Sequence, residues 1–382
     1  MSNLYKLQLR HSEIFSIYRQ SWISKLTFAL FLYCLFFFSI GHTQEWMQNI
    51  VDLEFQNTPR FFKKDVKRTW QELNKKNENF LYYQIKNNCV YGEKNQIHDL
   101  LSAICAKYPV KDMNLIYYMQ DYIEQSIFTP RKRYTPIFTS AKKVGDQNVI
   151  LFADWYFKIA DCNESKISSI PNNNVDPNSW GQLIPVINMH YKNIPWKNRL
   201  EQMVWRGGGN DGAYTQKNWT QFPRGTLVSL SKETYPRLIN ANFSLYHPWT
   251  VSDQNFFMNN IPPSSLLPTK QMEYKYQIDI DGVTATFTAL SWKLLSGSLV
   301  FKQQSNDIMW FHYALKPWEH YIPVDRNLTD VADKIMWAIE HDEKAKEIAD
   351  NGRQFALTHL MPEDILLYCY LALCKYASLQ RN

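Results

Sequence analysis

The sequence contains few glycines and none of the common nucleotide- or metal-binding patterns. Only 12 of its 382 residues are glycine, and no internal period is visible, which excludes glycine-rich repeats and low-complexity arrays. The glycines at 207–209 are not followed by Lys-Ser or Lys-Thr, so they form neither a P-loop nor a GxGxxG fingerprint. The six cysteines include no CxxC pair, which argues against a zinc site and against a dense disulfide framework.

The sequence also lacks a concentration of charge of one sign. Its 42 basic and 36 acidic residues give a net charge of +6 and are mixed along the chain. Without a long basic block we predict no nucleic-acid partner, whereas an anionic small ligand or an anionic membrane surface fits equally well. Aromatic residues are abundant at 15%, and the length favours two globular domains.

The N-terminal part contains one uncharged apolar run, at residues 26–40. Basic residues precede the run and acidic residues follow it, which predicts a cytoplasmic tail over residues 1–25. The run is short for a membrane span and near the upper limit for a signal-peptide core. We therefore expect residues 26–41 to be a signal-anchor or a cleaved signal peptide, with a buried or interfacial helix as the alternative. The protein would be a single-pass membrane protein or lie on the secretory-pathway or periplasmic side.

Residues 273–324 show the clearest secondary-structure pattern of the chain. A strand over 276–281 stops at Gly282, a turn of small residues leads into a short helix, and Gly297 ends that helix before a second strand at 298–302. This is the size of a βαβ unit. Ligands of parallel sheets lie at the carboxyl ends of the strands, so we expect a phosphate-bearing substrate here. Lys302 and His320 are candidate contacts, although a buried structural histidine is the alternative for His320.

Two groups of acidic residues could have a chemical role. Asp279 and Asp281 form a DxD pattern that could hold a divalent ion, but an Asp-Gly turn explains Asp281, and we predict no metal. Asp121 follows a strand over 114–119 and would point into the cleft of an α/β fold, where a general base works. The alternative for Asp121 is a helix-capping or turn aspartate.

Two arginines and one tryptophan are further candidates. Arg206 precedes the glycines at 207–209, which let the backbone approach a ligand while the arginine pairs with phosphate oxygens. Arg224 could be a second anionic clamp. Trp180, at the end of a long polar loop, is either an acceptor-binding aromatic or a loop anchor. After Asp330 the chain is helical, with a second helix starting at 341–343 and punctuated at Gly352.

Several segments, in their order and spacing, resemble glycosyltransferase family 90, which includes the capsule-associated (CAP10-type) and protein O-glucosyltransferase enzymes. They are YKYQIDIDG (274–282), SGSLVFKQQS (296–305), LKPWEHYIPV (315–324), residues 328–352 and WRGGG (205–209). The resemblance covers roughly residues 75–380. It implies an α/β GT-B-like architecture of two Rossmann-like domains facing a cleft. We expect an acceptor-side domain at 45–200, a donor domain at 201–360, and a C-terminal helix at 361–382 that packs back across the first domain.

The resemblance further implies a metal-independent, inverting transfer without a cofactor. A hexose or pentose, glucose or xylose in the first place, would pass from a UDP-sugar to a hydroxyl of a glycan, a lipid-linked glycan such as lipopolysaccharide or capsule, or a protein. By position, Asp121 matches the catalytic base. The residues assigned to donor binding are Arg206, Gly207, Gly208, Arg224, Gly282, Val283, Thr284, Ala285, Phe287, Ser298 and Lys302. On the acceptor side we place Tyr122, Trp155 and Trp180.

One position departs from the family pattern. The family has an arginine where this chain has Thr288, and without a metal the charge of the leaving diphosphate must be stabilised by arginines and amides. Arg206, Arg224 or Lys293 compensates, or the chain is a weakened or altered transferase. The alternatives are a membrane-tethered, non-catalytic sugar-binding member and a nucleotide-sugar hydrolase. The Cys-rich segment of the animal enzymes is not found, so a glycan or lipid-linked acceptor fits as well as a folded protein.

Overall fold

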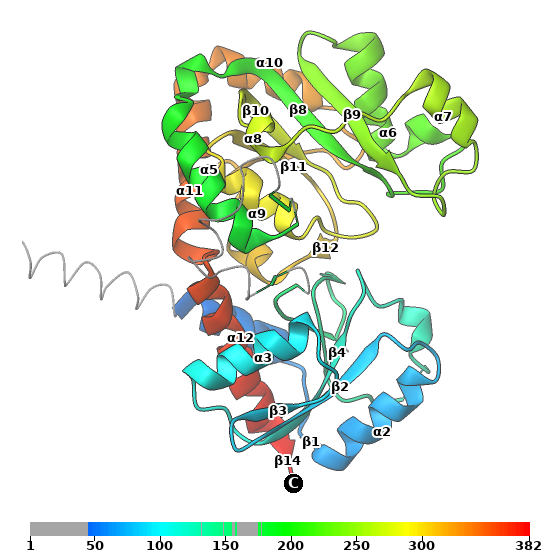
Figure 1. The fold of residues 1–382 in the computed structure, drawn as a ribbon, viewed down its shortest axis with the longest axis vertical. Coiled ribbons are helices and arrows are strands. Elements are labelled where there is room, and N and C mark those ends of the chain that lie inside the picture. Colours follow the sequence, from blue (N-terminus) through cyan, green and yellow to red (C-terminus); the bar gives the residue numbers. More distant parts are fainter. Residues whose placement is uncertain (1–44, 131, 148, 155–156, 159–174, 177) are drawn as a thin grey trace, which may run out of the picture. The chain divides into compact units, whose positions relative to one another are not determined.

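The computed structural model describes residues 45–130, 132–147, 149–154, 157–158, 175–176 and 178–382. The chain divides into two compact units, Met1–Asn49 and Ile50–Asn382, and every element described below belongs to the second (Figure 1). The apolar run at 26–40 and Trp155 lie outside the described residues. Across the ranges that are described, no helix has both the length and the apolar character needed to cross a membrane.

The first sheet is mixed and has five strands. Their spatial order is β3 (Cys89–Tyr91), β2 (Phe80–Lys86), β4 (Met113–Tyr118), β5 (Ile137–Thr139) and β7 (Val149–Leu151). β2 runs antiparallel to both of its neighbours, whereas β4, β5 and β7 are parallel. Its helices are α2 (Lys63–Asn74) and α3 (Gln96–Lys107). α3 begins where Asn95 accepts hydrogen bonds from the backbone N–H groups of Ile97 and His98, as an N-cap should.

The second sheet is parallel throughout. Its five strands, in spatial order, are β13 (Ile322–Val324), β11 (Leu299–Gln303), β10 (Tyr274–Asp279), β8 (Leu200–Gly209) and β9 (Ile239–Tyr246). From β8 the chain moves to β9 on one side and then returns to β10, β11 and β13 on the other. The strand order therefore reverses between β8 and β10, and in sheets of this kind the crevice at the carboxyl ends of those two strands is the usual ligand site.

The predicted βαβ unit is confirmed as β10, α9 (Thr288–Leu295) and β11. Side chains alternate across the strands, so Tyr276 and Ile278 of β10, and Ile280 just after it, enter the apolar core. The opposite face is polar although buried. There Asp279 lies in register with Lys302, and Lys293 of α9 reaches Asp279. Charged groups therefore occupy an interior layer beneath α9, next to the carboxyl end of the sheet.

Helices surround the second sheet and link it to the first. They are α5 (Trp180–Asn193), α6 (Pro223–Ser229), α7 (Gln254–Asn260), α8 (Pro268–Gln271), α10 (Val331–Glu340), α11 (Asp342–His359) and α12 (Pro362–Leu379). α5 packs against α8 and α9 of the second sheet, although the expected boundary at residue 200 assigned it to the first domain. α12 returns to the first sheet, where the Tyr368 hydroxyl donates to the Leu151 carbonyl at 2.9 Å (Figure 1).

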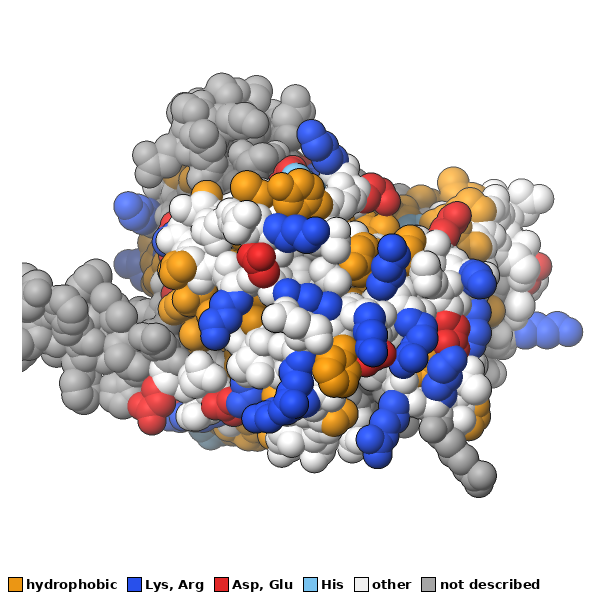
Figure 2. All heavy atoms as spheres, turned by 90° about the horizontal axis from the view of Figure 1, so that it is seen from below, with side chains coloured by type: hydrophobic (Ala, Val, Ile, Leu, Met, Phe, Trp, Pro, Cys, Tyr) orange, Lys and Arg blue, Asp and Glu red, His pale blue; other side chains and the backbone are white. Residues whose placement is uncertain are grey.

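Short strand pairs make further long-range contacts. β14 (Gln380–Arg381) pairs with β1 (Phe61–Phe62), and β12 (Asp307–Ile308) pairs with β6 (Lys142–Lys143). On the exposed face in Figure 2, lysine and arginine side chains are interspersed with acidic, apolar and neutral polar groups. The positive net charge is thus spread over that face and does not gather into a single stripe.

Candidate functional site

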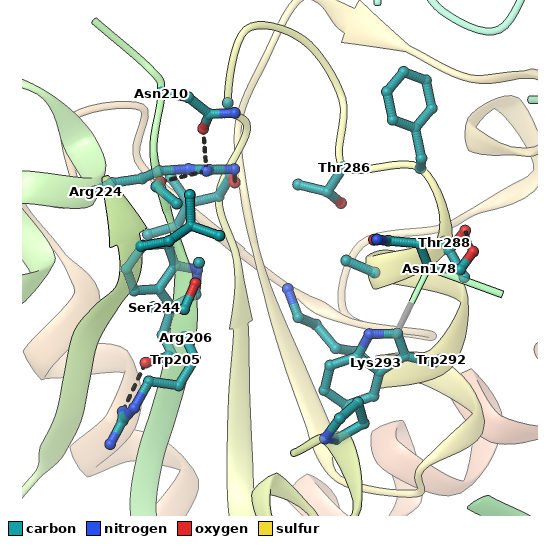
Figure 3. A pocket seen from close by; sticks show the side chains of 18 of the residues that line it. Asn178, Trp205, Arg206, Asn210, Arg224, Ser244, Thr286, Thr288, Trp292 and Lys293 are labelled. Atoms are coloured by element: carbon teal, nitrogen blue, oxygen red, sulfur yellow. Dashed lines mark hydrogen bonds between the residues drawn. The ribbon is translucent and has the colours of Figure 1, made fainter. Parts of the chain in front are cut away.

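A cavity of about 490 Å³ lies at the carboxyl ends of β8 and β10, where the strand order reverses. Its walls come from the end of β8, from the turn between β10 and α9, and from the first residues of α9; Asp121 also lines it. Figure 3 shows Arg206 and Arg224 on the β8 side, with Thr288, Trp292 and Lys293 of α9 across the cavity. The volume falls within the range of small-molecule sites.

The turn from β10 to α9 brings backbone amides to this cavity. The first N–H groups of a helix have no acceptor within the helix and lie at the positive end of its dipole. Thr288 and Ala289 of α9 line the cavity, and the Ala289 N–H donates to the Thr286 carbonyl at 3.0 Å. Phe287, just before the helix, has φ 46° and ψ −125°, a conformation that bulky residues rarely adopt. At Gly282 a Cβ would lie 2.7 Å from Asn210 Oδ1 and 2.9 Å from Arg224 Nη2, so a larger residue would displace one of these side chains.

Arg224 ties the ends of the two central strands together. Its Nε donates to the Asp281 carbonyl at 3.0 Å, Nη2 to the Ile280 carbonyl at 2.9 Å and Nη1 to the Gly208 carbonyl at 2.8 Å, with a further bond from Nη1 to Asn210 Oδ1. The side chain is only 8% exposed. No carboxylate of the described residues pairs with this guanidinium, so its positive charge is not neutralised locally.

Arg206 is a second arginine on the same wall, and no carboxylate in the described part of the chain pairs with it. Its Nη1 donates to the carbonyls of Trp205 and Asn240, both at 2.8 Å, and its Nη2 donates to Asn240 Oδ1 at 2.9 Å. Burial lowers the pKa of Arg206, as expected for a charge that leaves water without a carboxylate partner. The two arginines make this wall electropositive, and the effect is strong because the site is partly shielded from solvent.

The DxD acids are placed differently from ligands of a free metal ion. Lys293 Nζ lies 2.8 Å from Asp279 Oδ1, and the Thr286 hydroxyl donates to the same oxygen at 2.7 Å. Burial would raise the pKa of Asp279, but Lys293 and Lys302 lower it to about 2. Burial raises the pKa of Asp281. Asp279 is thus an ionised partner of Lys293, and within the described ranges no three His, Cys, Asp or Glu side chains form a metal-binding group.

Asp121 supplies the one carboxylate that lines the cavity among the described residues. It follows β4 and is half-buried, and burial raises its pKa although His247 acts in the opposite direction. None of the hydrogen bonds or ion pairs formed by the described residues uses its carboxylate, which leaves it available to a ligand. A carboxylate with a raised pKa at a cavity wall is suited to accept a proton.

Three of the residues assigned to the site lie elsewhere. Ser298 precedes β11 at the amino end of the sheet, where its Oγ accepts from Arg199 at 2.8 Å and donates to the Tyr274 carbonyl at 2.8 Å, so its role is structural. Lys302 lines a second cavity, of about 380 Å³, together with His312. Trp180 is 3% exposed and donates its indole N–H to the Leu360 carbonyl at 2.6 Å, so it does not present an aromatic face on a loop.

Two other candidates also lie apart from the cavity lining. Tyr122 is half-buried, and the Lys143 ammonium lies 5.7 Å from the centre of its ring. His320 Nδ1 accepts from the Lys316 backbone N–H at 3.1 Å, and its ring lies 5.0 Å from that of Phe355. These contacts agree with the alternative given for His320, a structural histidine. The sequence interpretation missed several lining residues, namely Asn178, Ser244, Ser265, Leu267 and Gln271. They belong to no chemical motif, and only the fold brings them to the cavity.

Comparison with known proteins gives a match over most of the chain. Residues 56–382 match the family model described as Glycosyl transferase family 90. Protein O-glucosyltransferase 3 of Homo sapiens is 36% identical over 188 residues, which cover 49% of this chain and 34% of that protein. Protein O-glucosyltransferase 2 of Danio rerio is 28% identical over 318 residues, covering 80% of this chain and 57% of that protein. The chain thus spans between about a third and somewhat over half the length of these relatives.

One solved structure, described as the crystal structure of TarM, aligns with 62% of this chain and 51% of its own, at 12% identity and a TM-score of 0.33. A likeness of this size carries no conclusion. The fold described above therefore stands on the strand pairings themselves: one mixed and one fully parallel sheet with helices around them.

Proposed function

Because this chain belongs to glycosyltransferase family 90, we propose that it transfers a sugar from a nucleoside diphosphate sugar to a hydroxyl group of an acceptor. One observation carries the proposal. One cavity, at the point where the strand order reverses, has two arginines on one wall and Asp121 on its lining. Among the described residues, no carboxylate pairs with either arginine and no group bonds the carboxylate of Asp121. The arginines suit a diphosphate leaving group, and the carboxylate suits a general base.

The diphosphate would lie between the arginine wall and the amino end of α9. A guanidinium has five N–H donors, and the four hydrogen bonds of Arg224 leave one on Nη2 for a phosphate oxygen. Thr288, in place of the family arginine, uses its hydroxyl to bond the Asn178 carbonyl at 3.1 Å. Lys293 is occupied by Asp279. We therefore assign the compensating positive charge to Arg206 and Arg224, assisted by the α9 amides.

The reaction would be a single displacement. Asp121 removes the proton of the acceptor hydroxyl as its oxygen attacks the anomeric carbon. The bond from that carbon to the diphosphate oxygen breaks, and the nucleoside diphosphate leaves with the electron pair. Attack opposite the leaving group inverts the anomeric configuration. The developing negative charge is stabilised by the arginines, and since Asp279 is an ion-pair partner of Lys293 we route no step through a metal.

UDP-glucose and UDP-xylose are the first donors to test, and the acceptor is a glycan, a lipid-linked glycan or a protein. Membrane attachment through residues 26–41, with a cytoplasmic N-terminus, stays a prediction, because those residues lie outside the described ranges. A non-catalytic sugar-binding member is the second candidate, and the specific observation in its favour is Thr288 at the position of the family arginine.

The test uses Asp121→Asn, which keeps the shape of the side chain and removes the base. Release of UDP from a panel of UDP-sugars, with water as the acceptor, is measured for both proteins, and UDP affinity is measured by titration calorimetry. We expect release to fall by about 10²-fold or more while UDP affinity stays within about twofold, because the base faces the acceptor. Unchanged release in the variant would remove Asp121 from the mechanism. Binding of UDP-sugars without any release by the wild type would favour the non-catalytic candidate.

A further inference from the structure

One tryptophan near the cavity is exposed to an unusual degree. Trp249 is 75% exposed, whereas tryptophans of folded proteins are on average highly buried because they carry a large apolar surface. None of the hydrogen bonds formed by the described residues uses its indole N–H. The residue therefore presents both a flat apolar face and a free donor to solvent.

The turn that carries Trp249 is fixed to the end of β8. The Thr250 hydroxyl donates to the Gly209 carbonyl at 2.5 Å, and the Thr250 N–H donates to the His247 carbonyl at 3.0 Å. On the other side, the Tyr214 N–H donates to the Thr250 carbonyl at 2.6 Å. Because these hydrogen bonds already hold the backbone of the turn in place, little backbone freedom would be lost when the indole binds a ligand.

The same turn adjoins the donor cavity and the proposed base. The ring of His247 lies 4.5 Å from that of Trp249, centre to centre. A Cβ on Gly208, a cavity-lining residue, would lie 3.0 Å from His247 Nε2. The charges of His247 and Asp121 also influence each other. Neither His247 nor Trp249 is among the lining residues, but His247 adjoins the lining residue Gly208, so Trp249 lies just outside the cavity.

The cavity beside Trp249 is lined by both apolar and polar groups. Leu245 and Val283 line the cavity and are 45% and 41% exposed. Arg206, Asn210 and Ser244 belong to the same lining. A lipid chain would bury these polar groups without hydrogen-bond partners, which is costly. A pyranose ring fits better, because its C–H faces are apolar and its hydroxyls radiate from the edge.

We propose that Trp249 and His247 form a subsite for a carbohydrate acceptor. One face of a pyranose ring stacks on the indole, and hydroxyls at the ring edge bond to the His247 imidazole while another hydroxyl reaches Asp121. The inference rests on the proposed transferase function and narrows its acceptor to a sugar.

The test measures binding of methyl glycosides to the protein in the presence of UDP. The β-glucoside, β-galactoside, β-xyloside and β-mannoside are used as probes, and saturation-transfer NMR reports which ring protons contact the protein. We expect at least one probe to bind with the C–H protons of one ring face saturated. Trp249→Ala should weaken its binding about tenfold and Trp249→Phe by no more than about threefold, as expected when an aromatic face is lost or only reduced.

A matched control is Trp318→Ala, which removes another exposed tryptophan, 43% exposed, whose ring lies beside that of Trp337 and not beside His247. It should leave glycoside binding unchanged. The subsite is refuted if no glycoside binds the wild type, if Trp249→Ala binds the probe like the wild type, or if an octyl chain or a serine peptide binds through Trp249 instead. Wild-type UDP release tests the transferase separately: glycoside binding through Trp249 without UDP release would refute the transferase and retain the sugar subsite.

Discussion

Replacing Arg224 tests whether one side chain both assembles the cavity and binds the donor. Arg224→Met removes the guanidinium and leaves the carbonyls of Gly208, Ile280 and Asp281 without their donor. Hydrogen bonds from a charged donor contribute about 1.5–3 kcal/mol each, and water in the cavity will replace part of them. We therefore expect the free energy of unfolding to fall by about 3–5 kcal/mol.

Urea denaturation of the ligand-free protein measures this loss, and calorimetry measures UDP affinity for the fraction that stays folded. Arg237→Met is the matched control, since Arg237 is exposed and makes no hydrogen bond to the described residues. It should change the unfolding free energy by less than about 0.5 kcal/mol. If Arg224→Met behaved like this control, Arg224 would not be the clamp between β8 and β10, and the electropositive wall would need another explanation.

Two further predictions concern charges at the site. Because burial raises the pKa of Asp121 and a base must be deprotonated, UDP-sugar turnover should fall with decreasing pH through a value above that of an ordinary aspartate; an acid limb at or below the ordinary value would contradict this. Lys293→Met should destabilise the protein by about 3–5 kcal/mol at pH 7, because it leaves Asp279 charged and unpaired. The pKa of Asp279 is held at about 2 in the folded wild type, whereas an aspartate of the unfolded chain has a pKa of about 3.9. Ionised Asp279 therefore stabilises the wild-type fold at any pH above about 3.9, and this contribution is lost only as the pH falls toward 2. In the variant the buried acid can take up a proton at higher pH, so the gap in unfolding free energy should be smaller at pH 4.5 than at pH 7, and an equal gap would refute the pairing.

Local patterns predicted the central unit of the second sheet well. The strand, helix and strand expected over 276–302 are β10, α9 and β11, and Gly297, with φ 68°, follows the end of α9 as expected. The polar step at 341–343 also separates α10 from α11. Gly352 was misleading, since it lies inside α11. A Cβ there would lie 2.6 Å from the His320 carbonyl, so this glycine serves tertiary packing and does not mark a break in the helix.

The site was predicted less completely, for a physical reason. The resemblance assigned Arg224 to binding of the sugar donor. In the structure, most of its N–H groups instead bond backbone carbonyls, and these carbonyls come together only because β8 pairs with β10. Ser298 shares a motif with Lys302, yet it lies at the opposite end of β11 from the cavity edge. A motif does not say which end of its strand meets a ligand, and residues without reactive groups, such as Leu267, are recognised as lining residues only once the chain is folded.

The backbone at Phe287 has a consequence for how this protein can change. A bulky residue at φ 46° costs about 1–3 kcal/mol of stability, and glycine would adopt the same conformation without that cost. This strained residue stands where the chain enters α9, and it lines the cavity. Selection for a more stable fold would therefore favour relaxing this position, whereas selection for a rigid donor site would oppose it. Thermostability and turnover should trade against each other at this residue.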